Sequence, residues 1–186
     1  MAKIAWKPGT LLAPLPAVLV ASGTAEKPNL CTVAWTGIVC SDPAMTYISL
    51  RPSRYSHKII SETREFTINL TTGPLARRTD ACGVYTGAKV DKFKKYSFTP
   101  EPSQKISAPG VKESPLFLEC KVKEIKPLGS HDLFLAEIVG VNVEEDLVDE
   151  KGKLNLQKAN LLVYSHGEYL QTGRKLGSFG YSVKKK

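Results

Sequence analysis

A succession of short apolar runs, separated by turn-forming residues, limits what this chain can fold into. Each run is rich in β-branched, aliphatic or aromatic residues and is too short for most helices, which is typical of β-strands. Within one of them, "KVKEIK" alternates polar and apolar residues, as a half-buried antiparallel strand does. Gly140 interrupts the longest run and predicts a bend or bulge there. The predicted strands are Ala17–Ser22, Cys31–Val39, Thr46–Leu50, Phe66–Leu70, Leu116–Lys126, Leu133–Glu144 and Asn160–Tyr164.

Helical spacing occurs in only a few short segments, at about Tyr55–Thr63, Leu75–Ala81 and Val90–Lys94. Many short strands with few helices predict a mainly-β fold, a closed or nearly closed barrel. A chain of 186 residues suits one domain spanning residues 1–186. The proline-rich segment 98–115 shows no periodicity and predicts a long surface loop. Side chains fill the interior of a barrel of this size, so a ligand is expected outside it or at a subunit boundary.

The net charge of +8 permits nucleic acids, acidic partners or a phosphorylated ligand. The excess is spread along the chain, and the only basic run, "KKK" at 184–186, is expected to be a solvated end. Aromatic residues make up 8% and do not alternate with Lys or Arg, which argues against binding of single-stranded nucleic acid. The apolar stretch "LLAPLPAVLVASG" is broken by Pro14 and Pro16 and is too short to span a membrane, so a first strand is expected there rather than a secretion leader.

The four cysteines, Cys31, Cys40, Cys82 and Cys120, form no CxxC pair. They are predicted to be reduced and mostly buried, which indicates the cytoplasm. No His, Cys or acidic spacing suits a metal ion. Cys82 has no His close in sequence, so a small buried residue is favoured over a nucleophile.

The stretch "SLRPSRYSHKII", residues 49–60, predicts a strand that stops at a Pro-flanked turn and a helix that follows. Tyr55, Ile59 and Ile60 fit one face of that helix. Free N–H groups at a helix start, with serine hydroxyls and guanidinium groups, form a place for an anion such as phosphate. A second interpretation stays open, in which Ser53 only caps the helix and Arg51 and Arg54 are solvated.

Three further segments carry polar groups that suit a site. "PNLCTVAWTGIVCSDP" places hydrogen-bonding side chains around Trp35 and is otherwise a hairpin with a core Trp. "RRTDACGVYTGAKVDKF" predicts two tight turns, at "ACG" and "YTG", beside Lys89 and Lys92. His131, in "GSHDLF", is either a hydrogen-bond donor beside a ring that gains negative charge or a satisfied surface group.

Taken in order, these motifs resemble the flavin reductase-like family, and most closely its flavoredoxin branch of FMN-binding split-barrel proteins. The resemblance rests on "NLCTVAW", "CSDPAM", "SLRPSRYSHKII", "EFTINL", "ACG", "DKF", "GSHDLFLAEIVG" and "HGEYLQTGRKLGSFGYS", and it runs from about Pro14 to the C-terminus. It implies a split β-barrel with a few short peripheral helices, which works as a homodimer and binds one FMN per subunit near the dimer interface.

The resemblance also implies roles for individual residues. Arg51, Ser53 and Ser56 would hold the FMN phosphate, with Ser49 in the same set, and Lys92 would add charge. Asn29, Thr32 and the backbone of Val33, Ala34 and Trp35 would line the isoalloxazine, and Ser41 would lie at its polar edge. Cys82 and Gly83 would close over the ligand, and His131, the candidate catalytic residue, would stand near the reactive face or the nicotinamide site.

Two functions follow from the resemblance. One is an FMN-binding oxidoreductase that moves electrons from NADH, NADPH or a redox-protein donor to flavin or another acceptor. The alternative is a flavoredoxin-type electron-transfer protein with tightly bound FMN and no direct NAD(P)H turnover. Family reductases usually read "GDH" where this chain reads Gly129-Ser130-His131. Ser130 removes a carboxylate that Asp132 is the candidate to replace.

Overall fold

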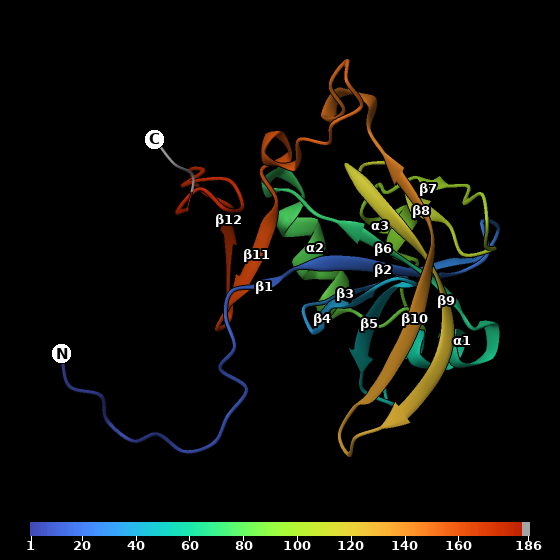
Figure 1. Cartoon of the computed structure of the whole chain (residues 1–186). Coiled ribbons are helices and arrows are strands. Elements are labelled where there is room, and N and C mark those ends of the chain that lie inside the picture. The colour runs from blue at the N-terminus through green and yellow to red at the C-terminus, as the bar shows by residue number, and fades with distance from the viewer. Residues whose placement is uncertain (184–186) are drawn as a thin grey trace.

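Antiparallel strands dominate the computed structural model, which describes residues 1–183 (Figure 1). The lysine run at 184–186 lies outside the described residues. One seven-stranded sheet has the order β3-β2-β6-β9-β10-β5-β4, and every neighbouring pair is antiparallel. Its strands are β2 (Val18–Gly23), β3 (Pro28–Val33), β4 (Thr36–Ser41), β5 (Ala44–Leu50), β6 (Glu65–Leu70), β9 (Leu116–Pro127) and β10 (Asp132–Val143). The mainly-β prediction is confirmed.

The two edge strands of this sheet, β3 and β4, follow one another in the chain and are joined only by Ala34 and Trp35. A two-residue link cannot cross an open seven-stranded sheet, so the sheet must curl until its edges meet. The N–H of Ser49 in β5 donates to the carbonyl of Trp35 (2.9 Å) and so holds β5 against the link between β3 and β4. The junction of these three strands is here called the seam. The prediction of one continuous strand over Cys31–Val39 is therefore wrong. No turn residue lies between Val33 and Thr36 to reveal the break.

Apolar side chains of β2 are buried on both faces of the sheet, and they belong to two different clusters. Val18 and Val20 pack inside the barrel with residues of the other strands, among them Phe66 and Phe134. Leu19 and Ala21 point outward and pack in a second cluster beneath helices. Strand side chains alternate between faces, so a strand covered on both sides reads as a continuous apolar run, as "VLVA" does.

Three short α-helices accompany the barrel: α1 (Tyr55–Thr63), α2 (Ala76–Val84) and α3 (Lys92–Lys95). Helix α1 has the predicted bounds, but its buried residues are Ser56 and Ile60, whereas Tyr55 is half-buried. Its N-cap is Arg54 without a side-chain hydrogen bond, so the interpretation of Ser53 as the cap is wrong. Helix α2 extends beyond the predicted Leu75–Ala81 and contains "ACG", so the turn predicted there is also wrong. The remaining helical turns are the 3-10 segments η1 (Gly73–Leu75), η2 (Glu145–Leu147) and η3 (Leu156–Ala159).

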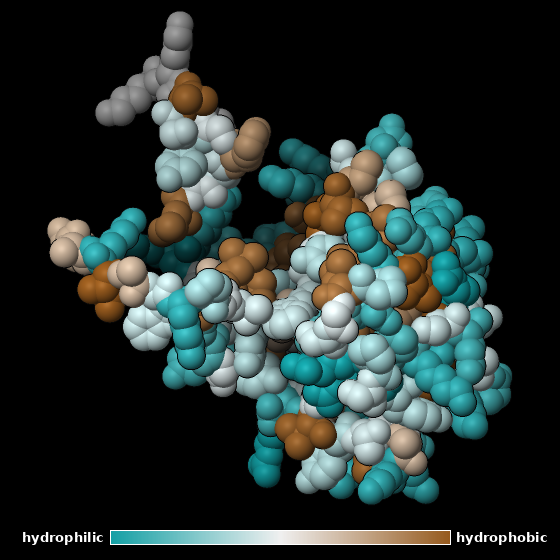
Figure 2. Space-filling model, turned by 90° about the horizontal axis from the view of Figure 1, so that it is seen from below, coloured by the Kyte–Doolittle hydropathy of each residue, from teal (hydrophilic) through white to brown (hydrophobic). Residues whose placement is uncertain are grey.

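A small sheet of β1 (Leu15–Pro16), β11 (Leu162–Ser165) and β12 (Glu168–Gln171) lies beside the barrel. Strands β11 and β12 meet at His166 and Gly167, whose positive φ angles of 49° and 88° form a tight hairpin turn. Both terminal segments project from this side of the molecule (Figure 1). In the space-filling view they stand apart from the body as arms that carry apolar side chains (Figure 2).

Segment 98–115 is more ordered than an aperiodic surface loop. Strands β7 (Pro100–Glu101) and β8 (Gly110–Val111) pair within it, and Phe98, Ala108 and Val111 are buried. Its backbone is anchored by Glu119 of β9, which is 1% exposed. The Glu119 carboxylate accepts hydrogen bonds from the N–H groups of Gln104 (3.0 Å) and Lys105 (2.7 Å) and from the Asn142 amide (2.7 Å).

The predicted bulge at Gly140 is confirmed by a register shift between Ile138 and Gly140. A Cβ atom at Gly140 would lie 3.0 Å from the Glu119 carboxyl carbon, so glycine leaves room for the carboxylate. Burial alone would raise the pKa of Glu119. The hydrogen bonds from Gln104, Asn142 and Lys105, with the Lys105 charge, outweigh burial and lower the pKa below its ordinary value.

We expect Glu119→Gln to lower the free energy of unfolding by about 2 kcal/mol, because an amide N–H then faces backbone donors and the charge-assisted bonds are lost. Since the folded-state pKa is depressed, this contribution is present above the ordinary carboxyl pKa of about 4.3 and is lost as pH falls through the folded-state value. Urea unfolding between pH 3 and 7 measures it. Glu124→Gln, at an exposed position of the same strand, is the control. An equal loss for both variants would contradict the anchoring role.

Candidate functional site

Two adjoining cavities lie beside the seam where β3, β4 and β5 meet. The first, here called the Trp35 cavity, has a volume of about 330 Å³. The second, the Ser56 cavity, has a volume of about 320 Å³. Since both are lined by Thr32, Leu50, Arg51, Arg54 and Gly83, they form one continuous hollow.

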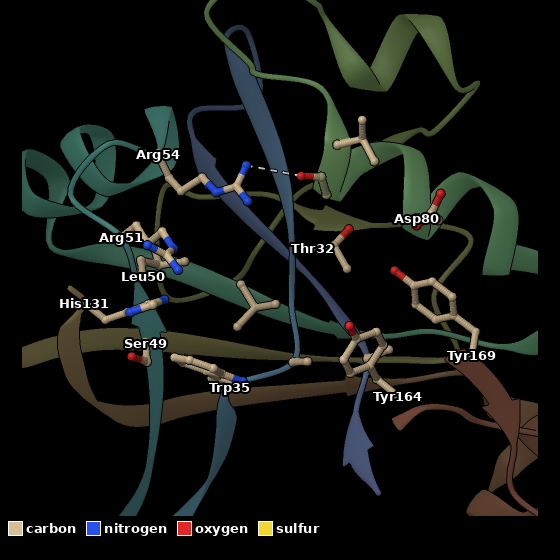
Figure 3. Close-up of a pocket in the computed structure, with 15 residues that line it drawn as sticks. Thr32, Trp35, Ser49, Leu50, Arg51, Arg54, Asp80, His131, Tyr164 and Tyr169 are labelled. Carbon is tan, nitrogen blue, oxygen red and sulfur yellow. Dashed lines mark hydrogen bonds between the residues drawn. The ribbon is translucent and has the colours of Figure 1, made fainter. Parts of the chain in front are cut away.

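The Trp35 cavity has two chemically different walls (Figure 3). On one side lie Arg51, Arg54, His131, Ser49 and Trp35. The facing wall carries Asp80 of α2, Tyr164 of β11 and Tyr169 of β12. Burial raises the pKa of Tyr169 to about 12, and the neighbouring Asp80 carboxylate adds to this. The cavity thus presents cations and a flat indole on one side, and a carboxylate with two phenols on the other.

His131 lies against Trp35, with the ring centroids 4.5 Å apart and the planes tilted by 38°. Its Nδ1 atom is 2.9 Å from the Ser130 hydroxyl. Partial burial lowers the pKa of His131, and the nearby Arg51 and Arg54 charges lower it further, against a smaller opposing effect of Asp132. This lowered pKa favours the neutral imidazole, and the Ser130 contact occupies Nδ1 rather than Nε2.

The Ser56 cavity gathers hydroxyl and cationic groups around the start of α1. Its lining includes Ser53, Ser56, Arg51, Arg54 and Lys92. Among residues 1–183, the pairs of opposite charge are Lys58–Glu62 and Lys123–Glu137, and the Asp132 carboxylate contacts His57. No carboxylate therefore pairs with the three cations of this cavity. Helix α1 also begins without a side-chain cap, which leaves backbone N–H groups free at its first turn.

Lys92 links strand β3 to helix α2 at the Ser56 cavity. It is 4% exposed, and its Nζ donates to the carbonyls of Leu30 and Cys82, both at 2.6 Å. Burial lowers the pKa of this ammonium group. An ammonium has three N–H donors, so one remains for a ligand. Helix α2 is tied to the same region, because Arg54 donates to the carbonyl of Gly83 (3.2 Å).

Most of the predicted site residues are brought together here. Thr32, Val33, Ala34, Trp35, Ser49, Arg51, Gly83 and His131 line the Trp35 cavity, and Ser53, Ser56, Cys82 and Lys92 line the Ser56 cavity. Asn29 lies behind them, where its amide donates to the Ser56 hydroxyl (2.7 Å) and orients it. Ser41 lines neither cavity, because it pairs with Ala44 at the far end of β4. Within the single chain, Ser41 therefore does not lie at the site where it was predicted.

Cys82 is not a nucleophile in this site. It lies in helix α2 rather than in a loop, and its side chain is fully buried. Burial raises the pKa of the thiol to about 11 despite the nearby Lys92 charge, so thiolate is scarce at neutral pH. All four cysteines are free, and all but Cys40 are buried.

The carboxylate of Asp132 does not take the place left by Ser130. It lies 2.8 Å from His57 Nε2, on helix α1, instead of being free to act beside a substrate. Sequence reasoning missed this pair because the two residues are 75 positions apart. It also missed Asp80, Tyr164 and Tyr169, for which the only local signal was the His-Gly turn between two short aromatic runs.

The comparison with known proteins agrees with this geometry. Residues 11–173 match the family described as flavin reductase like domain. The chain belongs to the flavin reductase-like family.

Solved structures give the same result for the fold. Flavoredoxin of Desulfovibrio vulgaris (Miyazaki F) is 30% identical, with 98% of this chain and 100% of that chain covered and a TM-score of 0.90. An FMN-binding protein from Thermus thermophilus with bound 1-cyclohex-2-enone is 25% identical over 96% of this chain and 98% of its own, with a TM-score of 0.79. A Shewanella frigidimarina NCIMB 400 protein with a split barrel domain is also 25% identical, covers 89% and 85%, and has a TM-score of 0.79. The predicted split barrel is thereby confirmed.

Within residues 1–183, no helix is long and apolar enough to cross a membrane. The same residues contain no cluster of three or more His, Cys, Asp or Glu side chains arranged for a metal ion.

Proposed function

We propose that this protein is an FMN-binding oxidoreductase that moves electrons from NAD(P)H or a redox partner to flavin or another acceptor. The observation that carries the proposal is the continuous hollow at the seam, in which uncompensated cations adjoin a flat aromatic wall. FMN has the complementary form, a dianionic phosphate at one end of a planar ring. One solved neighbour is itself named an FMN-binding protein.

The Ser56 cavity suits the phosphate. Arg51 and Arg54 offer charge-assisted hydrogen bonds, Ser53 and Ser56 offer hydroxyls, and the uncapped start of α1 offers backbone N–H groups. Lys92 contributes charge and one remaining donor from below. A dianion placed here would balance most of the local positive charge.

The Trp35 cavity suits the ring system. Thr32, Ser49 and the backbone from Val33 to Trp35 line one side of the hollow, where polar atoms of a flavin would find partners. FMN, when bound, supplies the hydride- and electron-accepting chemistry. His131 would contribute its imidazole at the edge of the ring, to donate a hydrogen bond or to move a proton as charge develops.

The alternative function is a flavoredoxin-type electron carrier with tightly bound FMN and no direct NAD(P)H turnover. It is favoured by two features: position 130, where the "GDH" reductases carry a carboxylate, is a serine, and the Asp132 carboxylate is engaged by His57 of α1. The similarity to a flavoredoxin at 30% identity supports the same reading. Both functions use the same flavin site and differ in the electron donor.

We also propose that the protein works as a cytoplasmic homodimer. The two arms carry large apolar side chains that are strongly exposed in the single chain, including Trp6 (71%), Leu176 (80%) and Phe179 (107%). Such surfaces usually lie against another chain. A second copy would also cover the open side of the Trp35 cavity, whose outer wall is formed by Tyr164 and Tyr169 beside these arms.

The purified protein should show flavin absorption bands and release FMN on heating. We expect Arg51→Ala to raise the FMN dissociation constant roughly 10- to 100-fold, since a charge-assisted hydrogen bond contributes about 1.5–3 kcal/mol. Lys58→Ala, at an exposed lysine of α1 outside both cavities, is the matched control and should leave the constant unchanged. Titration followed by flavin fluorescence measures both. A colourless protein that takes up no added FMN would refute the cofactor, and an unaltered constant in Arg51→Ala would refute the phosphate assignment alone.

NADH and NADPH oxidation, assayed with and without added free flavin, separates the two functions. A reductase consumes nicotinamide, and His131→Ala should then slow flavin reduction about 100-fold, the lower end of general acid–base contributions, while FMN affinity changes little. A carrier shows no nicotinamide oxidation, yet its bound FMN is still reduced by dithionite. Equal loss of rate and affinity in His131→Ala would show that the histidine only supports the structure.

Light scattering after gel filtration tests the dimer. The wild-type protein should elute at twice the chain mass of 20.4 kDa. Replacing Leu176 and Phe179 together by Ser should shift the protein toward monomer, because both side chains lose apolar contact area. Leu128→Ser, at an exposed position of the β9–β10 turn, is the control. A wild-type monomer at all concentrations would reject the proposal.

A further inference from the structure

The hydrogen-bonded pair of His57 and Asp132 lines neither cavity, yet it connects two segments that do. His57 lies in the first turn of α1, three residues after Arg54, and Arg51 and Ser53 precede the same helix. Asp132 opens β10 and directly follows His131. The pair therefore links the proposed phosphate side of the site to the proposed ring side.

Its surroundings hold the pair in one geometry. The His57 and Asp132 side chains are only 16% and 15% exposed, so water competes weakly for their hydrogen bond. The His57 ring packs edge-on against Phe134, at 5.0 Å between centroids, and Phe134 is fully buried in the barrel core. Asp132 is also fixed through its backbone, because it pairs with Leu50 of β5, a residue that lines both cavities.

The Asp132 carboxylate acts on the His131 imidazole through its charge. The groups that face the His131 imidazole are Trp35, Ser130, Arg51, Arg54 and Asp132. Asp132 is the only acid among them. Held by His57, its carboxylate points toward α1. Once released, it can turn to the neighbouring imidazole, attract the proton and draw the ring away from Trp35.

We propose that His57 and Asp132 act as a positioning pair, which keeps the Asp132 carboxylate on α1, away from the His131 imidazole, and thereby leaves that ring seated against Trp35. The role in electron transfer rests on the proposed flavin function, whereas the effect on the His131 ring does not. Neither residue is expected to touch the flavin or its substrate. Both act through His131.

The test is an NMR titration of the ligand-free protein, which follows the ring Cε1–H signal of His131. His131→Ala assigns the signal. His57→Phe keeps an aromatic ring on Phe134 but removes the N–H donor. We expect it to raise the His131 titration midpoint by about 0.5–1 pH unit, since the freed carboxylate stabilises the imidazolium. We also expect it to reduce the ring-current shift from Trp35, for which Trp35→Leu gives the zero point.

Two further variants separate positioning from a general loss of structure. His57→Gln retains a donor near the position of Nε2 and should restore the wild-type midpoint. Asp132→Asn removes the acid and should move the midpoint downward, opposite to His57→Phe. A helix that is merely destabilised would not produce opposite shifts. Glu62→Gln, which breaks the exposed Lys58–Glu62 pair of the same helix, is the matched control and should change nothing.

On the FMN-loaded protein, His57→Phe should slow flavin reduction by the functional donor about 10-fold while the FMN dissociation constant changes less than about 3-fold, as expected for a displaced rather than deleted group. An unchanged midpoint and ring-current shift in folded His57→Phe would overturn the proposal. If His57→Phe does not fold, the absence of any downward shift in Asp132→Asn would do the same. Failure to bind FMN would refute the proposed function and leave the ligand-free titration valid.

Discussion

The two-residue link between β3 and β4 is the constraint on which the rest of the structure depends. Because Ala34 and Trp35 must join the two edges of a seven-stranded sheet, the sheet closes, and the closure is completed by the hydrogen bond from Ser49 to Trp35. The barrel interior is filled by side chains of its own strands, so a ligand has no room there. The seam is different, because the edge strands β3 and β4 do not pair with each other there, and backbone and side-chain polar groups are left facing outward. The candidate site lies at the seam for this reason.

Burial of β2 on both faces explains how the remaining walls of the site arise. The outward face, Leu19 and Ala21, needs a cover, which Leu75 of η1, Cys82 of α2 and Phe93 of α3 provide. This packing brings the end of α2 beside β3. Lys92 then bonds to the carbonyls of Leu30 and Cys82, which fixes strand and helix to each other beneath the Ser56 cavity. Core packing thus determines where the cations of the site are held.

The sequence predicted those features whose cause is local. Periodicity placed α1 at its observed bounds, and Gly140 marked the bulge that makes room for Glu119. The seam was missed because "CTVAWTGIV" has no turn residue between Val33 and Thr36, where sheet closure imposes the break. The Ser53 cap failed because the preferred cap residue lies one position before the observed N-cap, Arg54.

Site residues divide in the same way. The segment from Ser49 to Ser56 is continuous in sequence, so its hydroxyl and guanidinium groups are recognisable from the sequence as a place for an anion. Asp80, Tyr164 and Tyr169 enter from α2 and the β11–β12 hairpin, and only the fold brings them opposite His131. The His57–Asp132 pair is likewise invisible without the fold, although both residues stand beside recognised motifs.

Charge in the site links its function to the stability of the protein. Arg51, Arg54 and Lys92 surround one cavity without an acidic partner within the described chain, and Lys92 is desolvated as well. Like charges held close together oppose folding, so the ligand-free protein keeps this arrangement only because packing and the carbonyls of Leu30 and Cys82 hold it. An anionic ligand that binds the folded state alone removes this repulsion and adds about 2.7 kcal/mol at a hundredfold excess over its dissociation constant. The site is therefore the part of the fold that gains most from an anion, which is the physical reason to expect the phosphate of a flavin there.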